Sequence, residues 1–157
     1  MSDPFIVLIS ISKKFELQIT RLFVNVGRTP KSNTLSFFYK GRCFYIGDKK
    51  QRLTFEEAVT LCKSQGARLF EPRNMEANEA IVNAVANNSR PPFWLGLVST
   101  PERPSAFRYM SDGLMPYYTN WDSAQPDNDK GIEYCSQITY KDRYVFTLSC
   151  RITVESK

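Results

Sequence analysis

The stretch Tyr117–Cys135 concentrates the side chains that could hold a metal ion or a polar ligand. Its composition predicts a loop, because Pro126, Gly131 and several Asn and Asp residues interrupt helical and strand periodicity. Carboxylate and amide oxygens suit calcium, which takes about six to eight oxygen ligands in a flexible shell. The segment therefore indicates either a calcium-binding loop or an ordinary polar surface loop. Its oxygen donors are Asp122, Gln125, Asp127, Asn128, Asp129 and Glu133.

The triplet Gln125–Pro126–Asp127 is the most constrained part of this loop. A proline at this place can hold the two flanking side chains on one side of a turn. A cis Gln125–Pro126 bond would do so, since cis peptide bonds in proteins are essentially confined to X–Pro.

These residues resemble the long sugar-binding loop of a C-type lectin domain, with Trp121 before the triplet and Glu133 two residues before Cys135. Within that family the closest likeness is to the collectins, such as the pulmonary surfactant proteins. The resemblance runs from about Gly41 to Ile138 and implies an α+β fold and carbohydrate binding. It is supported by Thr54–Leu69, Pro72–Val85, Phe93–Leu97 and Phe107–Trp121.

The resemblance also implies a site. Gln125, Asp127 and Glu133 would hold calcium and sugar together, with Asn128 as a nearby helper. In this family a Gln-Pro-Asp triplet goes with galactose-type sugars, including N-acetylgalactosamine, and Glu-Pro-Asn with mannose-type sugars. Exchanging amide and carboxylate across the proline swaps hydrogen-bond donor for acceptor, and so selects another arrangement of hydroxyls.

The end of the chain departs from the family. Aligning Cys150 on the family's third cysteine places Val145–Phe146–Thr147 where a Trp-Asn-Asp ligand strand is expected. Two side-chain ligands are then missing, one of them anionic, so we expect calcium to bind weakly or not at all. Asp142 is a candidate substitute. The resemblance also expects a closing strand beyond Cys150, so we place a lectin domain at 41–157 that diverges or is cut short after about residue 138.

Four cysteines allow three pairings and are compatible with disulfides in an oxidising compartment. The resemblance implies that Cys62 pairs with a cysteine of the last strand and Cys135 with a later one. Cys150 is the only late cysteine, and we expect Cys135–Cys150. Cys62 and Cys43 are then free, paired with each other, or paired with another chain. We expect an extracellular, secreted protein, in which the sequon at Asn87 is a candidate glycosylation site.

Residues 1–40 form a separate N-terminal segment in this interpretation. Phe5–Ile11 is apolar but too short to span a bilayer, and Asp3 precedes it where a signal peptide carries basic residues. Four apolar residues further on have the spacing of a coiled-coil seam, like a collectin neck. The richness in β-branched residues favours a strand or poorly ordered structure instead. The seam candidates are Phe15, Ile19, Leu22 and Val26.

The remaining elements follow from periodicity and caps. Leu35–Ile46 is predicted as one strand. One helix begins after Thr54, with Glu57 completing a capping box, and ends at Gly66; a second begins after Asn74. Trp94 and Trp121 are predicted to be core residues. Further strands are predicted at Phe93–Val98, Phe107–Met110, Cys135–Tyr140 and Tyr144–Val154.

Composition excludes several function classes. The 157 residues carry a net charge of +5 without any long Lys/Arg block, which argues against nucleic-acid binding. There is no His, which excludes His-based triads and His-ligated zinc. Asp127 and Glu133 could in principle act as acid and base, but no nucleophile motif accompanies them, so we predict no enzyme. A glycan-binding lectin and a calcium-independent protein-binding module both remain; an oligomer is compatible with either.

Overall fold

The computed structural model describes residues 6–12, 35–40, 42–46, 53–86, 92–138 and 145–149. In this part of the chain two helices pack with one sheet, which confirms the α+β prediction. The helices are α2 (Phe55–Ser64) and α3 (Met75–Ala86), and a short 3-10 turn, η2, covers Asp129–Gly131. The strands are β1 (Ile6–Ser12), β2 (Leu35–Tyr39), β3 (Arg42–Ile46), β4 (Arg68–Leu69), β5 (Phe93–Thr100), β6 (Arg103–Tyr109), β7 (Glu133–Ile138) and β8 (Val145–Ser149).

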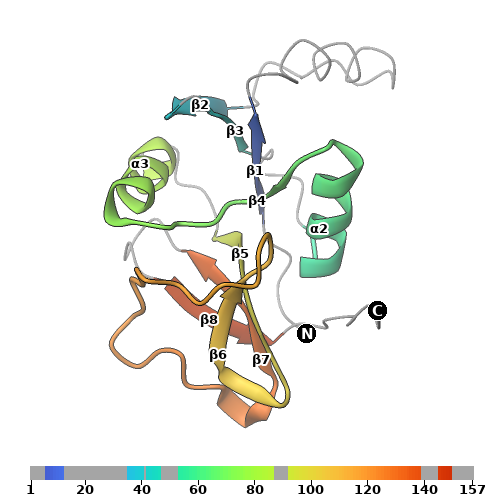
Figure 1. Cartoon of the computed structure of the whole chain (residues 1–157), viewed down its shortest axis with the longest axis vertical. Helices are drawn as coiled ribbons and strands as arrows, with labels where there is room; N and C mark the ends of the chain where they lie inside the picture. Colours follow the sequence, from blue (N-terminus) through green and yellow to red (C-terminus); the bar gives the residue numbers. More distant parts are fainter. Residues whose placement is uncertain are drawn as a thin grey trace.

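The sheet has the order β2-β3-β1-β5-β7-β8, with β4 paired to β1 and β6 paired to β5. The named strand pairs are antiparallel except β1 with β5, which are parallel. In Figure 1 the dark blue β1 runs from β5 up toward the β2–β3 hairpin, and the two helices lie on either side of it in this view. The division at residue 40 stays a prediction, but β1 and β2 share one sheet with the later strands.

The prediction of a single strand over 35–46 is wrong. Two strands form a hairpin there, with Phe38 opposite Cys43 and Tyr39 opposite Arg42. The chain reverses at Lys40, which has a φ of 44° in the left-handed region. The alternating apolar pattern continues on both sides of this reversal, so the pattern alone could not reveal the turn. The strand favoured for the N-terminal segment is present over Ile6–Ser12, whereas the coiled-coil candidates lie outside the described residues.

Helix α2 begins where its capping box predicts. The main-chain N–H of Glu57 donates to the Thr54 hydroxyl at 3.3 Å, and the N–H of Thr54 donates to Glu57 Oε2 at 2.8 Å. These two bonds satisfy donors that a helix start otherwise leaves without partners. The helix is followed by Gly66, which has a φ of 62°. The face it buries consists of Phe55, Ala58 and Cys62.

Helix α3 begins at the predicted cap as well, since the N–H of Ala77 donates to Asn74 Oδ1 at 2.8 Å. It buries Ala77, Ile81 and Val82 against the sheet. In the described part of the chain, no helix is long and apolar enough to cross a membrane.

Strand β5 lies at the centre of the core and is buried on both faces. Because side chains alternate along a strand, Phe93, Leu95 and Leu97 contribute to one cluster and Trp94 to the other. Trp94 Nε1 donates to the carbonyl oxygen of Leu53 at 3.0 Å, so its one polar group is satisfied in the core. Trp121 is partly buried, with its ring centroid 4.9 Å from that of Phe107. Trp94 is thus a core residue, as predicted, whereas Trp121 packs against the core and is only partly buried.

Candidate functional site

A long loop, residues 110–132, leaves the sheet after β6 and returns to it at β7. Its first turn is fixed to the sheet by main-chain bonds. Met110 N–H donates to Gly96 O at 2.9 Å, and Tyr109 N–H donates to Leu114 O at 3.0 Å. A Cβ at Gly96 would lie 2.9 Å from Glu71 Cγ, so a larger residue there would displace the Glu71 side chain.

The carboxylate of Glu71 holds the same turn from the other side. Its Oε1 accepts from the Ser111 N–H at 2.9 Å, and its Oε2 accepts from the Ser111 hydroxyl at 2.7 Å. Arg73 donates to Glu71 Oε2 at 2.8 Å and forms an ion pair with Asp112 Oδ2 at 2.7 Å. The Glu71 side chain is only 4% exposed, so this carboxylate is desolvated and depends on these partners. Together these contacts anchor the start of the long loop to the segment before α3.

Tyr109 and Asp112 complete this anchor. The Arg73 guanidinium lies 4.1 Å from the centre of the Tyr109 ring, and the Tyr109 hydroxyl donates to Pro72 O at 3.1 Å. The N–H of Leu114 donates to Asp112 Oδ1 at 3.0 Å. This hydrogen bond, followed by the Arg73 charge, lowers the pKa of Asp112 below its ordinary value.

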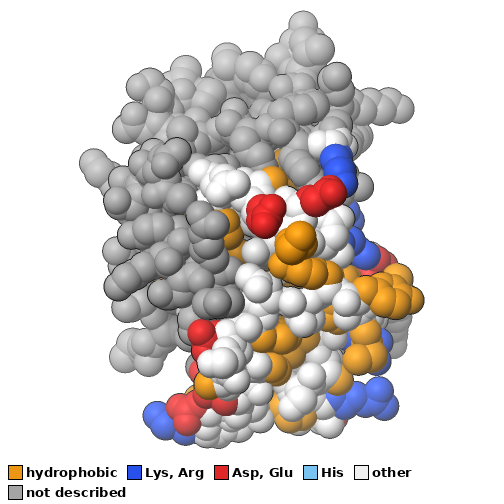
Figure 2. Space-filling view, turned by 90° about the vertical axis from the view of Figure 1, so that its left-hand side faces the viewer, with side chains coloured by type: hydrophobic (Ala, Val, Ile, Leu, Met, Phe, Trp, Pro, Cys, Tyr) orange, Lys and Arg blue, Asp and Glu red, His pale blue; other side chains and the backbone are white. Residues whose placement is uncertain are grey.

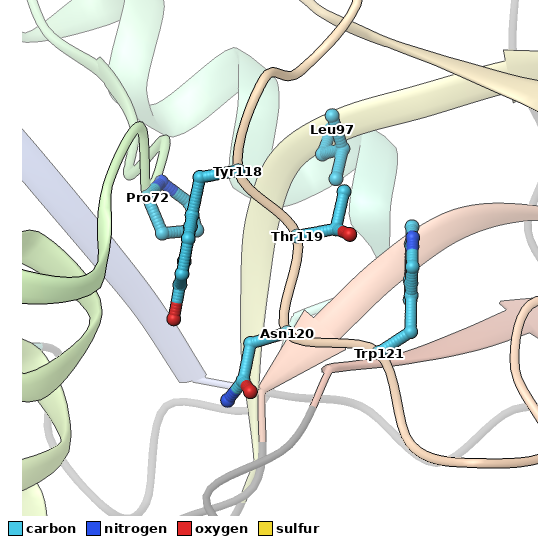
Figure 3. A pocket seen from close by; sticks show the side chains of 6 residues that line it. All are labelled: Pro72, Leu97, Tyr118, Thr119, Asn120 and Trp121. Atoms are coloured by element: carbon cyan, nitrogen blue, oxygen red, sulfur yellow. The ribbon is translucent and has the colours of Figure 1, made fainter.

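The middle of the loop packs on the core and leaves little space. Figure 3 shows the Tyr118 ring beside Pro72, with Thr119 and Trp121 on the side of Leu97. The gap between these residues has a volume of about 10 Å³, which is room for about one water molecule. Burial and the Glu79 carboxylate raise the pKa of Tyr118. A sugar would therefore have to bind on the outer surface of the loop rather than in this gap.

Asp122 opens the turn that carries the triplet. Its Oδ1 accepts from the Ala124 N–H at 3.3 Å and its carbonyl oxygen accepts from the Gln125 N–H at 2.9 Å. The Gln125–Pro126 peptide bond is cis, as considered from the sequence. Gln125 is half-buried and Asp127 is exposed.

Asn128 and Glu133 close the end of the loop on itself. Asn128 has a left-handed backbone, with φ 50° and ψ 49°, and its Oδ1 accepts from the Glu133 N–H at 3.1 Å. In return, Glu133 Oε2 accepts from the Asp129 N–H at 3.3 Å. One hydrogen bond through the carboxylate and one through the main-chain N–H thus hold Glu133 beside the residues that directly follow the triplet.

Strand β8 pairs with β7 and contains Val145–Thr147, the residues that replace the expected calcium ligands. Glu133 lies opposite Ser149, and Val145–Thr147 lie opposite Ser136–Ile138. The replaced ligand positions are therefore on a strand paired with the one that begins at Glu133. Asp142 and Asn87 lie outside the described residues, so the substitute ligand and the glycosylation site stay predictions.

Comparison with known proteins identifies the family. The Lectin C-type domain matches residues 51–154, well over half of this chain. The chain belongs to the C-type lectin domain family. Members of this family are binding proteins rather than enzymes, in agreement with the prediction that this domain is not an enzyme.

Several collectins are similar to this C-type lectin domain. Collectin-11 of Danio rerio is 24% identical over 105 residues, which cover 67% of this chain and 38% of that protein. Collectin-10 of Homo sapiens is 25% identical over 111 residues, 71% of this chain and 39% of that protein. Pulmonary surfactant-associated protein D of Bos taurus is 31% identical over 85 residues, 54% of this chain and 22% of that protein. The chain thus matches less than two fifths of the length of each relative.

The loop of this lectin domain offers the type of ligand that calcium prefers, but too few of these ligands for a complete site. Gln125, Asp127 and Glu133 offer hard oxygen donors of the type that calcium prefers. One of them, Glu133 Oε2, already accepts a main-chain hydrogen bond. Within the described ranges, no group of three or more acidic residues or cysteines could hold a metal ion. The three side chains thus supply part of a shell of about six to eight oxygens.

The cysteines divide into one bonded and one free among those with described side chains. Cys135 is disulfide-bonded. Its partner is outside the described side chains, so the pairing with Cys150 stays a prediction, as does the state of Cys43. Cys62 is free, which was one of the alternatives, and is buried in the cluster with Phe55 and Trp94. Burial raises the pKa of the Cys62 thiol to about 12.

The sequence did not reveal the residues that anchor the loop. Glu71 and Arg73 flank Pro72 just before α3, and a charged pair directly after the buried Leu69 and Phe70 was a usable signal. Their partners Ser111 and Asp112 lie about forty residues further on, and no local pattern joins the two segments. Neither pair was part of the predicted site.

Proposed function

We propose that this lectin domain binds glycans of the galactose type on the outer surface of the long loop, assisted by a weakly held calcium ion. Gln125, Asp127 and Glu133 are the side chains that bind, and Asn128 positions Glu133. The observation that carries this proposal is the pair of hydrogen bonds between Glu133 and residues 128 and 129. They hold Glu133 next to the triplet, which supplies the amide of Gln125 and the carboxylate of Asp127.

Each residue has a definite task in this proposal. Asp127 is exposed and offers a carboxylate acceptor, whereas Gln125 offers both an amide donor and an acceptor. A calcium ion, when bound, would align the vicinal hydroxyls of the sugar and carry part of the binding energy. The side chains then hydrogen-bond to the same hydroxyls, and the order amide–proline–carboxylate selects the galactose-type arrangement.

The selectivity can be tested by reversing that order. The double variant Gln125→Glu with Asp127→Asn keeps the number of oxygens and the net charge of the triplet. Retention on immobilised galactose and on immobilised mannose is compared, each with calcium and with a chelator. We expect the native chain to be retained on galactose and the double variant to move toward mannose. Equal retention of both proteins on both resins would contradict the assignment of selectivity to the triplet.

A second candidate function, calcium-independent binding of a protein, is favoured by one observation. The first half of the long loop exposes large apolar side chains, namely Met110, Leu114, Met115 and Tyr117. Figure 2, which views the side of α3 and the long loop, shows hydrophobic side chains in the middle of the described surface, with charged ones mainly toward its borders. Exposed apolar surface of this kind is common at protein interfaces. The test is binding to a partner protein in the presence of a chelator. Binding that persists with the chelator and is lost in Leu114→Asp would favour this function over sugar binding.

An extracellular location is part of the proposal. The disulfide at Cys135 fits an oxidising compartment, where such bonds persist. Weak single-site sugar affinities would favour an oligomer, because several linked sites bind a glycan surface more tightly than one.

A further inference from the structure

Strand β1 occupies an unusual place for the first strand of the chain. It lies inside the sheet, between β3 on one edge and β4 and β5 on the other. Leu8–Ser12 pair antiparallel with Arg42–Ile46, while Ile6 and Val7 pair parallel with Phe93 and Trp94. The strand thus joins the β2–β3 hairpin to the β5–β7–β8 part of the sheet (Figure 1).

The two edges that receive β1 belong to the core. Phe44 and Ile46 of β3 are 4% and 1% exposed, and Phe93 and Trp94 of β5 are 0% and 1% exposed. Without β1, the main-chain N–H and C=O groups of both edges would lose their partners beside buried side chains. Such unpaired groups are costly, so the gap between β3 and β5 requires a strand.

The sequence of β1 suits the gap between β3 and β5 in its own chain or in another copy of it. Ile6–Ser12 reads IVLISIS, without a charge, proline or glycine and with four β-branched residues. The segment 13–34 separates it from β2. At roughly 3.3–3.6 Å per residue, any chain of this length can span at most about 70 Å. That exceeds the diameter of about 40 Å expected for a compact chain of this size.

We propose that the gap between β3 and β5 accepts β1 from a second copy of this chain, so that two copies exchange their first strands. The exchanged dimer contains the same strand pairs as the monomer, with Ser12 of one copy opposite Arg42 of the other. Exchange of an identical element in this way is a low-cost route to a dimer.

The connection sets the conditions under which exchange occurs. A strand tethered to its own gap by a short connection meets that gap at an effective concentration on the order of millimolar. Dilute chains therefore fold as monomers. Chains refolded together at about 1 mM form exchanged dimers in a comparable amount, since the two pathways then compete evenly. Shortening the connection hinders folding back and favours the dimer.

The test uses two single variants of the full chain, Ser12→Cys and Arg42→Cys. They are mixed, unfolded under reducing conditions, refolded at about 10 µM or about 1 mM and then oxidised. Peptide mass mapping finds whether a disulfide joins position 12 of one copy to position 42 of the other. The matched control mixes Ser12→Cys with Ser36→Cys, because β2 is separated from β1 by β3. We expect the first mixture to give the intermolecular bond at high concentration only, and the control to give none.

The native chain provides a second readout that needs no variant. Light scattering after chromatography should show a larger share of dimer after refolding at the high concentration, and more still when about ten residues are removed from 13–34. A chain that stays monomeric at both concentrations would overturn the proposal. A dimer without the bond between positions 12 and 42 would overturn it as well, because another surface would then join the copies.

Discussion

The main-chain N–H of Glu133 donates to the side-chain Oδ1 of Asn128 at 3.1 Å. This bond closes the segment 128–133 and fixes the first residue of β7 relative to the triplet. It requires the left-handed backbone of Asn128, a conformation that asparagine tolerates better than most residues. The proposed sugar site therefore depends on a residue whose own side chain is directed to the main chain.

Replacing Asn128 separates its two roles. Asn128→Ala loses the acceptor and strains the left-handed backbone, and we expect it to lower the free energy of unfolding by about 1–3 kcal/mol. Asn128→Gly relieves the strain and lacks only the acceptor, so its loss should be smaller. Asn128→Asp keeps the acceptor and should remain close to the native stability. Urea unfolding of the three variants measures this order; equal stability of all three would contradict the role of the bond.

Replacing Glu71 tests the anchor at the start of the loop. Glu71→Gln keeps the shape but removes the charge that holds Ser111 and Arg73, and we expect a loss of about 1–3 kcal/mol in the free energy of unfolding. Hydrogen exchange at the Ser111 N–H should accelerate, because that group donates to Glu71. The matched control Ser111→Ala removes one hydroxyl and leaves the N–H bond in place. Unchanged exchange at residue 111 in Glu71→Gln would argue against the anchor.

The lowered pKa of Asp112 predicts that the stability of the fold depends on pH. Its pKa is lowered in the folded protein, first by the Leu114 N–H and then by Arg73. A lowered folded pKa means that the charge stabilises the fold above the ordinary carboxyl value of 3.8 and that this stabilisation is lost as the pH falls below it. Asp112→Asn should therefore be less stable than the native chain at neutral pH. The difference should disappear in acid unfolding curves once the pH falls below the lowered pKa of Asp112, where the carboxyl group is neutral like the Asn amide.

The burial of Cys62 predicts that its thiol is unreactive in the native protein. The thiolate is the reactive form, and burial raises the pKa of Cys62 to about 12, so the native chain should resist alkylation at pH values near 8, roughly the ordinary thiol range. Mass spectrometry should find Cys62 unlabelled by iodoacetamide in the native protein and labelled after unfolding. Rapid labelling of the native chain would show that this side of α2 opens to solvent. Cys62→Ser should destabilise the fold by about 1–3 kcal/mol, since it buries a hydroxyl in an apolar cluster.

Local signals made much of this fold predictable. The Thr54–Glu57 capping box and the Asn74 cap each mark the start of a helix, and each joins residues only three apart in the sequence. The hairpin turn at Lys40 was missed, because the apolar pattern continues through it.

Long-range relationships were not accessible from the sequence in the same way. The pairing of Ile9 with Leu69 and the bond from Ser111 to Glu71 join segments that share no pattern. The triplet and Glu133 were recognised because their order matches a family, whereas the Asn128 bond that links them is a consequence of backbone geometry.

Calorimetric titration of the oxidised chain with calcium, with and without excess galactose, tests the central claim most directly. We expect binding at about millimolar calcium, since an incomplete ligand set of low charge gives weak affinity. Galactose should strengthen it, and Asp127→Ala should abolish it. Absence of heat across that range, in a chain that unfolds cooperatively, would contradict calcium-assisted sugar binding by the loop.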